Sequence, residues 1–225
     1  VVVRVNSPGG SASASEEMWK AIEQTANEKP VIVSMGDVAA SGGYYIAAGA
    51  DTIMANPTTI TGSIGVIGVV LNAEDLFEDE LGVTFDGVRT SPYADMYSAN
   101  RPLSEGERQL IGRYIDETYT TFLQRVATAR GMDTSAVHEL AQGRVWSGHD
   151  AREVGLVDTL GTLRDAVTMA GQAAGMGDGP YRTRILPRPK TVFERLNERF
   201  ATQTAQLWQS MAATPLERKL LIEPI

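Results

Sequence analysis

Ser41 is the residue of this sequence whose neighbours are best suited to nucleophilic chemistry. It follows an apolar run of strand length, stands at the mouth of a predicted short helix, and is followed by Gly42 and Gly43. Two glycines after a serine would expose its hydroxyl and free the backbone N–H groups that stabilise an oxyanion, and a helix N-terminus adds a positive potential. The string differs from the G-x-S-x-G nucleophile elbow but shares its logic. The alternative role for Ser41 is that of a helix cap.

A second glycine turn, residues 6–10 (NSPGG), follows the first apolar run of the chain. Its glycines would let backbone amides approach a substrate carbonyl and form the other half of an oxyanion hole, where each donor contributes roughly 3–4 kcal/mol in the transition state. The turn is neither a Walker A nor a dinucleotide fingerprint, so we do not interpret it as a phosphate cradle. Taken alone, it is an ordinary connection between a strand and a helix.

The elements predicted around these turns alternate between strands and helices. This alternation is typical of βαβ units and of a largely parallel sheet, so the predicted fold class is α/β. Strands are predicted at residues 1–5, 31–35, 52–55 and 83–88, a turn at 36–43, and helices at 14–27, 73–81, 104–130, 135–141, 151–155 and 163–174. Both glycine turns therefore lie where strands end, which is where open α/β sheets place their ligands.

The composition shifts at residues 175–180 (GMGDGP), which we interpret as a domain boundary. Residues 1–175 are predicted to form the main domain. Residues 176–225 are predicted to form a small appendage with an edge strand at 181–186 and an amphipathic helix at 192–211.

Composition excludes several classes of function. The formal net charge is −8 without a compensating basic cluster, so a nucleic-acid partner is not expected. The chain has no cysteine, which excludes disulfides, thiolate metal sites and a cysteine nucleophile. It has no run of about 18 apolar residues and no signal-peptide pattern. Because it opens within a predicted core strand and not with methionine, we expect it to be a fragment of a longer protein.

Five strings of the chain together resemble one known family. They are residues 5–10 (VNSPGG), 38–45 (VAASGGYY), 56–65 (NPTTITGSIG), 145–148 (VWSG) and 155–158 (GLVD). In this order, from residue 1 to about residue 175, they are similar to the signal peptide peptidase A (protease IV) family. The resemblance implies the superfold shared by Clp protease and crotonase, with ββα units, and a serine that attacks a peptide carbonyl with a lysine as general base.

The resemblance also implies a role for each matching residue. Ser41 would be the nucleophile and Ser63 would orient the lysine base by a hydrogen bond. The remaining implied roles belong to the turns: oxyanion amides from Gly42 and Gly10, and substrate binding by Ser7 and Gly9.

The lysine base is the point at which this sequence departs from the family pattern. A lysine acts as a base only when neutral, which requires burial to lower its pKa from about 10.4 to roughly 7–8. The chain contains four lysines, none of which we expect to be buried beside the nucleophile. Lys20 and Lys29 flank a predicted surface helix, and Lys190 and Lys219 lie in the appendage.

The family has two forms that place the lysine differently. In the shorter form it follows the strand that matches residues 83–88, where this chain reads Arg89-Thr90-Ser91-Pro92-Tyr93. Arg89 cannot serve, because a guanidinium stays protonated. The longer form has two homologous halves, with the lysine in the first and the serine in the second. We therefore expect this chain to be the C-terminal half of the longer form, with the base supplied by the N-terminal half of the same protein and with assembly into a homo-oligomer.

Neither histidine offers a better base. His138 and His149 are both predicted to be surface residues, and although His149 is followed by Asp150, adjacent residues cannot easily orient one another as a triad requires. No His or carboxylate pair shows convincing metal-ligand spacing, so neither a metal nor another cofactor is predicted.

The sequence thus predicts a serine endopeptidase that degrades cleaved signal peptides and other short hydrophobic peptides. By resemblance, it would act at the bacterial cytoplasmic (inner) membrane, with its catalytic part facing the periplasm or the cell exterior. Two alternatives stay open. One is a crotonase-like enzyme that acts on an acyl-CoA thioester through turn amides. The other is a non-catalytic assembly half, suggested by the amphipathic helix and the acidic surface.

Overall fold

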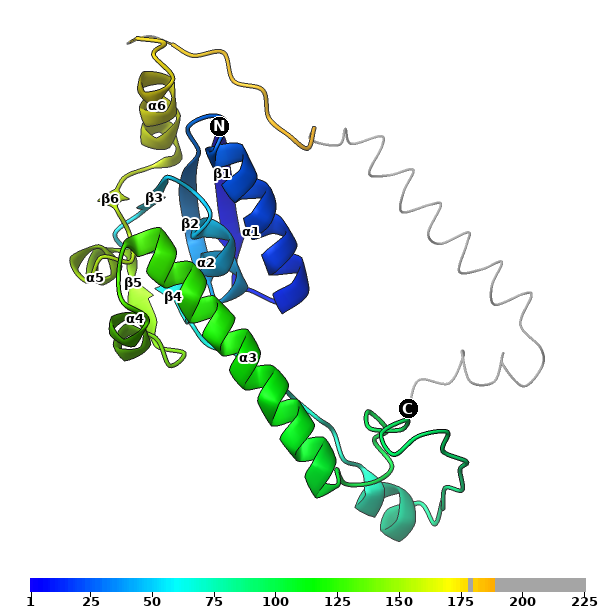
Figure 1. Ribbon diagram of the computed structural model, residues 1–225. Coiled ribbons are helices and arrows are strands. Elements are labelled where there is room, and N and C mark those ends of the chain that lie inside the picture. Colours follow the sequence, from blue (N-terminus) through cyan, green and yellow to red (C-terminus); the bar gives the residue numbers. More distant parts are fainter. Residues whose placement is uncertain (178–179, 189–225) are drawn as a thin grey trace, which may run out of the picture. The chain divides into compact units, whose positions relative to one another are not determined.

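The computed structural model describes residues 1–177 and 180–188 (Figure 1). Val1–Tyr181 form one compact unit, and a second unit begins at Arg182. The structure shows no strand at residues 181–186, where the sequence analysis placed an edge strand, and the predicted helix at residues 192–211 lies outside the described residues. Among the described helices, none is both long and apolar enough to cross a membrane.

The centre of the unit is a mostly parallel sheet, which confirms the predicted α/β class. Its middle strand is β2 (Ile32–Ala40). The first residues of β2 pair with β1 (Val2–Ser7) on one side and β3 (Thr52–Ala55) on the other. The last three residues of β2 pair in parallel with β4 (Ile60–Gly62). The carboxyl ends of the parallel strands β1, β2 and β4 therefore meet at one edge of the sheet.

β4 was not predicted from the sequence, and neither were two further strands. β5 (Val145–Ser147) pairs antiparallel with β4, and β6 (Thr159–Leu160) pairs in parallel with β3. Strands of three and two residues are too short to show a period of two, so their pairing depends on the neighbouring strand and not on local pattern.

Most predicted helices are confirmed within a few residues. The helices are α1 (Ala12–Ala26), α2 (Gly42–Ala47), α3 (Glu105–Arg130), α4 (Thr134–Leu140), α5 (Gly148–Glu153) and α6 (Leu163–Ala173). The long α3 begins with a capping box, in which Ser104 and Glu107 exchange side-chain and backbone hydrogen bonds. It ends at Gly131, whose φ of 61° is the left-handed conformation that favours glycine.

The second strand is longer than predicted, because β2 continues to Ala40 through residues that the sequence analysis assigned to a turn. A bulge makes this possible, since the pairing moves from Val5 opposite Met35 to Ser7 opposite Ala39. The Asn6 side chain fills the bulge and accepts the Val38 N–H at 3.1 Å. A strand that runs on to Ala40 delivers Ser41 directly at the edge of the sheet.

The core lies between the sheet and the helices that cover it. Val33, Met35 and Ile53 are fully buried on β2 and β3, and the buried Tyr44 donates its hydroxyl to the Leu156 carbonyl at 2.7 Å. The nearby Asp158 carboxylate accepts the Ile53 N–H at 2.6 Å and pairs with the Arg130 guanidinium at 2.8 Å. The turn at residues 155–158 therefore anchors the end of α3 to the sheet.

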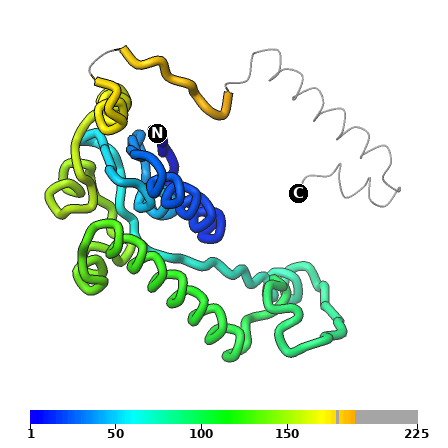
Figure 2. Tube along the Cα trace, turned by 45° about the horizontal axis from the view of Figure 1, so that its top comes forward, coloured from blue at the N-terminus to red at the C-terminus, as the bar shows by residue number. Residues whose placement is uncertain are grey.

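Residues 69–103, which lie between β4 and α3 in the chain, form an arm that projects away from the sheet (Figure 2). The predicted helix at 73–81 is reduced to a π-helical turn, η1 (Leu76–Glu80), and the predicted strand at 83–88 is wrong. Val88 is 99% exposed and Phe85 is 50% exposed. A strand needs a partner edge for its backbone groups, and within the described residues this apolar run has none.

An ion cluster attaches the arm to the start of α3. The Arg101 guanidinium pairs with Asp95 at 2.7 Å and with the buried Glu107 at 2.6 Å, and the Ser104 N–H also donates to Glu107 at 2.7 Å. The hydrogen bond from Arg101, followed by that from the Ser104 backbone, lowers the pKa of Glu107 to about 2. The arm therefore depends on an ionised Glu107.

Acid should weaken this attachment. A carboxyl whose folded pKa of about 2 lies below its ordinary value of 4.5 contributes stability that is complete above pH 4.5 and is lost as the pH falls towards 2. We expect the melting temperature to fall more steeply over roughly pH 5 to pH 2 in the wild type than in Glu107→Gln, which cannot ionise. Thermal unfolding followed by circular dichroism measures this, with the exposed neighbour Glu105→Gln as control. Equal slopes for the wild type and Glu107→Gln would contradict the role of this cluster.

Candidate active site

Ser41 and Ser63 lie in register at the carboxyl edge of the sheet. Ala40 of β2 pairs with Gly62 of β4, and each serine is the next residue of its strand. The Ser41 N–H donates to the Gly62 carbonyl at 2.9 Å, which ties the two strand ends together. Neighbouring strands are about 4.8 Å apart. Two serines separated by 22 positions in the sequence are therefore brought side by side at one edge.

Both serines leave their strands in a strained backbone conformation. Ser41 has a φ of 52° and Ser63 a φ of 48°, values that residues other than glycine rarely adopt. Although Ser41 is the residue before α2, its side chain makes no capping hydrogen bond, so the simple capping role considered from the sequence does not apply. Neither hydroxyl has a hydrogen-bond partner among the described residues, which leaves both available for chemistry.

The glycine turn after β1 packs directly against the Ser41 turn. A Cβ added to Gly9 would lie 2.8 Å from both the Gly42 nitrogen and the Ser41 Cβ. A Cβ added to Gly42 would lie 3.3 Å from the Gly10 nitrogen. These approaches require glycine. They also bring the backbone N–H groups of Gly10 and Gly42 close together next to Ser41, as an oxyanion hole requires.

A pocket of about 810 Å³ opens in front of these residues and is lined by Ser41, Ser63, Gly10 and Gly42. Its walls come from the start of α1, from α2, from the extended segment after β4, and from one face of α3. The α3 residues in the wall are Tyr114, Ile115, Asp116, Thr118, Tyr119 and Phe122. The sequence analysis predicted α3 as a helix but missed its contribution to the pocket, because the partner of a helix face cannot be known from its period.

Tyr45 forms an apolar part of the pocket wall, and contacts with Phe122 and Glu16 fix its side chain. Its ring packs on Phe122 with centroids 4.8 Å apart, and its hydroxyl donates to Glu16 at 2.5 Å. Burial, followed by the hydrogen bond to Glu16, raises the pKa of Tyr45 to about 12. Burial alone would raise the pKa of Glu16, but hydrogen bonds from Tyr45, Arg125 and Lys20 lower it overall. Tyr45 is thus a neutral, fixed wall and not an acid.

Ser7 and Gly9, which were predicted to bind substrate, are not among the described residues that line the pocket. The Ser7 hydroxyl accepts the Gly9 N–H at 3.2 Å and shapes the turn that presents Gly10. A Cβ on Gly43 would meet the Ser7 carbonyl at 2.6 Å, so α2 also packs on this residue. A direct contact of either residue with substrate stays a prediction.

No lysine lies among the described residues that line the pocket. The Lys20 side chain is 56% exposed and pairs with Glu16 at 3.2 Å, and Lys29 is exposed. Arg89 lies on the arm and pairs with Asp95 at 3.0 Å. Lys190 and Lys219 lie outside the described residues. The part of the chain that the structure describes therefore brings Ser41 together with the Gly10 and Gly42 amides, the predicted nucleophile and oxyanion donors, and places no lysine beside them.

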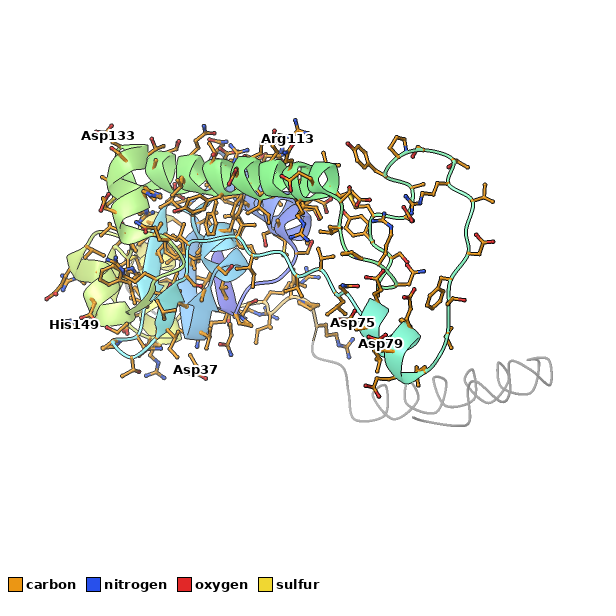
Figure 3. All side chains as sticks on the ribbon, turned by 90° about the horizontal axis from the view of Figure 1, so that it is seen from below. Asp37, Asp75, Asp79, Arg113, Asp133 and His149 are labelled. Atoms are coloured by element: carbon orange, nitrogen blue, oxygen red, sulfur yellow. The ribbon has the colours of Figure 1, made fainter. Side chains whose placement is uncertain are left out.

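The two histidines occupy different places. His149 lies at the end of the unit away from the arm that carries Asp75 and Asp79 (Figure 3). It is not in the pocket wall, so the trio of Ser41, His149 and Asp150 is not assembled. His149 does lie near Asp150 and Glu153 on the surface of α5, but these exposed groups need no ion to explain them. His138, interpreted from the sequence as a surface residue, lines the pocket even though it is exposed.

The chain is similar in sequence to known proteins. Residues 23–177 match the family model described as Peptidase family S49. Protease 4 of Salmonella typhi is 46% identical over 175 residues, which cover 77% of this chain and 28% of that protein. The chloroplastic serine protease SPPA of Arabidopsis thaliana is 41% identical over 192 residues, which cover 84% of this chain and 28% of that protein. The chain therefore spans little more than a quarter of the length of these two relatives.

Among solved structures, the ClpP1 N165D mutant from Listeria monocytogenes is similar with a TM-score of 0.46 and 16% sequence identity. The likeness covers 74% of this chain and 76% of that chain.

The close approach of Gly42 to its neighbours predicts how a side chain would act there. A Cβ at this position would lie 2.5 Å from the buried Ser15 hydroxyl, so Gly42→Ala should lower the free energy of unfolding by about 1–3 kcal/mol. Removing the hydroxyl in the double variant with Ser15→Ala should restore part of this loss. Gly87→Ala is the control, since a Cβ there meets nothing within 4 Å. Urea unfolding measures all three, and a stable Gly42→Ala would disprove the packing.

Proposed function

This chain belongs to peptidase family S49 and stands among the serine peptidases, and from this premise we propose that it is the nucleophile-bearing C-terminal half of an endopeptidase of the signal peptide peptidase A type. The observation that carries the proposal is Ser41. Its unpartnered hydroxyl leaves the sheet in a left-handed turn and faces a pocket that also holds the amides of Gly10 and Gly42. Backbone strain of this kind is concentrated at functional sites.

The proposed chemistry is acyl transfer from the substrate amine to water. The Ser41 oxygen attacks the peptide carbonyl carbon and passes its proton to a base, while the Gly10 and Gly42 amides stabilise the oxyanion by about 3–4 kcal/mol each. Collapse of this intermediate breaks the C–N bond, and the base returns the proton to the leaving amine. Water, activated by the same base, then hydrolyses the ester and regenerates the Ser41 hydroxyl.

The base is a neutral lysine that belongs to the N-terminal half of the same protein. Ser63 supports this assignment, because its free hydroxyl lies in register with Ser41 and can accept a hydrogen bond from an amine placed between them. A lysine that enters the pocket would be desolvated, and this lowers its pKa towards the value that a base requires. Protease 4 of Salmonella typhi and SPPA of Arabidopsis thaliana, of each of which this chain covers 28%, are long enough to contain such a half.

The substrates are short hydrophobic peptides, with cleaved signal peptides as the main class. The pocket supports this because Tyr45, Ile115 and Phe122 give it a largely apolar wall. Burying apolar side chains there contributes roughly 25 cal/mol for each Å² removed from water. The site of action is the bacterial cytoplasmic membrane, with the catalytic part facing the periplasm or the cell exterior, where cleaved signal peptides are within reach.

The protein works as a homo-oligomer in which the arm contacts a neighbouring copy. The extended segment before and within the arm is apolar and uncovered: Ile67 is 91% exposed, Val69 80% and Leu71 72%. Contiguous exposed apolar surface of this kind marks interaction sites. Every described residue that lines the pocket belongs to the proposed peptidase domain of residues 1–175.

The two alternatives raised by the sequence lose ground for separate reasons. A crotonase-like enzyme would use the turn amides but has no need of a free Ser41 hydroxyl in a strained turn, and membership of peptidase family S49 favours hydrolysis of peptides. A non-catalytic assembly half would tolerate the loss of that hydroxyl. Ser41→Ala therefore separates a catalytic from an assembly role.

Covalent labelling tests the nucleophile and the origin of its base. We expect a fluorophosphonate probe to modify Ser41 in the intact protein, as identified by mass spectrometry, and to leave the isolated chain unlabelled because its base is missing. Ser63→Ala should slow labelling by roughly 10²-fold, whereas Ser135→Ala, on the exposed face of α4, should not. Labelling of the isolated chain would reveal a base within it. A complete lack of labelling in both would overturn the proposed function.

Assembly can be tested on the arm. Val69→Asp with Leu71→Asp should shift the protein to a smaller species in analytical ultracentrifugation, because a charge would be buried in the interface without a partner. Val145→Asp replaces a comparably exposed valine outside the arm and should leave the oligomer intact. An unchanged sedimentation profile of the arm variant would show that the arm is not the interface.

A further inference from the structure

Three residues other than glycine have positive φ in the described part of the chain, and all three line the same pocket. They are Ser41, Ser63 and Gln142, the last with a φ of 57°. Strained residues of this kind persist where the surrounding structure holds them for a function. The first two have roles in the proposed chemistry. Gln142 has none, although it is exposed and lines the same pocket.

The backbone of Gln142 is fixed by a tight turn that docks beside Ser63. The Arg144 N–H donates to the Ala141 carbonyl at 3.0 Å, and the central residues Gln142 and Gly143 both have positive φ, as in a type I′ turn. Gly143 in turn donates its N–H to the Ile64 carbonyl at 2.9 Å. The turn is therefore a continuation of the β4–β5 pairing, and Gln142 is held at a constant place relative to the two serines.

Gln142 also organises two aromatic side chains of the pocket wall. Its N–H donates to the Tyr119 hydroxyl at 3.3 Å, and this hydroxyl lies 2.9 Å from the Nδ1 atom of His138. The two rings meet edge to face, with centroids 5.8 Å apart. The Gln142 side-chain amide donates to the His138 carbonyl at 3.4 Å. Three residues from α3, α4 and the turn thus form one hydrogen-bonded unit, which we call the polar wall.

The polar wall presents one donor and one acceptor without partners. The Tyr119 hydroxyl accepts the Gln142 N–H and lies beside His138 Nδ1, and we take the arrangement in which it donates its own proton to Nδ1 and the imidazole proton stands on Nε2. Nε2 has no hydrogen-bond partner among the described residues, and neither has the Gln142 side-chain oxygen. A donor and an acceptor on adjacent side chains match a primary carboxamide, which carries one carbonyl and one NH₂ group.

We propose that Gln142 and His138, which Tyr119 holds in place, bind the carboxamide side chain of a glutamine or asparagine in the peptide substrate, and so add a polar selectivity to an otherwise apolar pocket. The inference rests on the proposed peptidase function. Asp116 lines the same pocket and disfavours a carboxylate in place of the amide, since two like charges would be brought close together. The wall determines specificity and is not assigned a proton transfer, because neither ring forms a hydrogen bond with Ser41.

Specificity constants of the intact protein test this proposal. In a series of apolar peptides, a single glutamine is moved through each position, with leucine and glutamate in its place as matched sets. At one position we expect glutamine to exceed leucine in kcat/KM by about tenfold, the effect of one or two hydrogen bonds, and to exceed glutamate by at least as much. Equal constants for glutamine and leucine at every position would overturn the proposal.

Variants identify the wall as the source of the preference. His138→Phe and Tyr119→Phe should reduce the ratio of glutamine to leucine towards one, whereas His138→Gln, which keeps a donor near the place of Nε2, should retain part of it. His149→Phe replaces the histidine outside the pocket and should leave the ratio unchanged. An unaltered ratio in His138→Phe would assign the preference to other residues and refute the polar wall.

A binding measurement separates failure of the wall from failure of the peptidase function. In the Ser41→Ala protein, the His138 ring signals, identified by their loss in His138→Gln, should shift on addition of the glutamine peptide and stay in place with the leucine peptide. Such a shift without hydrolysis of any peptide by the wild type would sustain the wall and disprove the peptidase. The absence of a shift would disprove the wall whatever the activity.

Discussion

The site depends on the parallel pairing of β2 with β4 and on the hydrogen bond from the Ser41 N–H to the Gly62 carbonyl. Ala40 opposite Gly62 fixes the register, and a shift by one residue would turn one serine away from the edge. Each serine then turns abruptly out of its strand at a positive φ, so both hydroxyls end on the same side without binding the backbone. The strain of these two turns is balanced by the sheet that precedes them, whose central strand is almost wholly buried.

The first glycine turn is coupled to this register through the bulge between β1 and β2. Asn6 occupies the bulge and holds Val38, so that Ser7 and Ala39 come into register and Gly9 reaches the Ser41 turn. The string NSPGG therefore has two functions. Its asparagine and serine shape the strand end and the turn, and its last glycine presents an amide to the pocket. Glycine is required here for close approach between two backbones, which a side chain would prevent.

An element could be predicted from the sequence when the residues that stabilise it are close to it in the chain, and could not be when they are distant. α3 was predicted within one residue because its cap, its period and Gly131 are local signals. The strand at residues 83–88 was wrong because alternation shows only that an apolar face exists, and not that a partner edge does. Ser41 was identified from its glycine turn and Ser63 from a string that resembles a family, whereas the places of Gln142 and His138 in the pocket were missed. Their place in the pocket depends on the docking of a turn beside Ile64, for which no local pattern exists.

The described residues carry the proposed nucleophile, the proposed oxyanion donors and an exposed apolar arm, but place no lysine in the pocket. The missing lysine and the exposed arm have a common explanation if the base comes from another part of the assembly. A serine hydroxyl is a weak nucleophile until a base adjoins it, so a protomer that lacks the base cannot attack the polypeptides it meets. Desolvation of the lysine also requires that the pocket be closed by its partner, and closure needs apolar contact surface. In such a protein, burial of the arm and activation of Ser41 would be two consequences of the same association, and the activity would be confined to the assembled state.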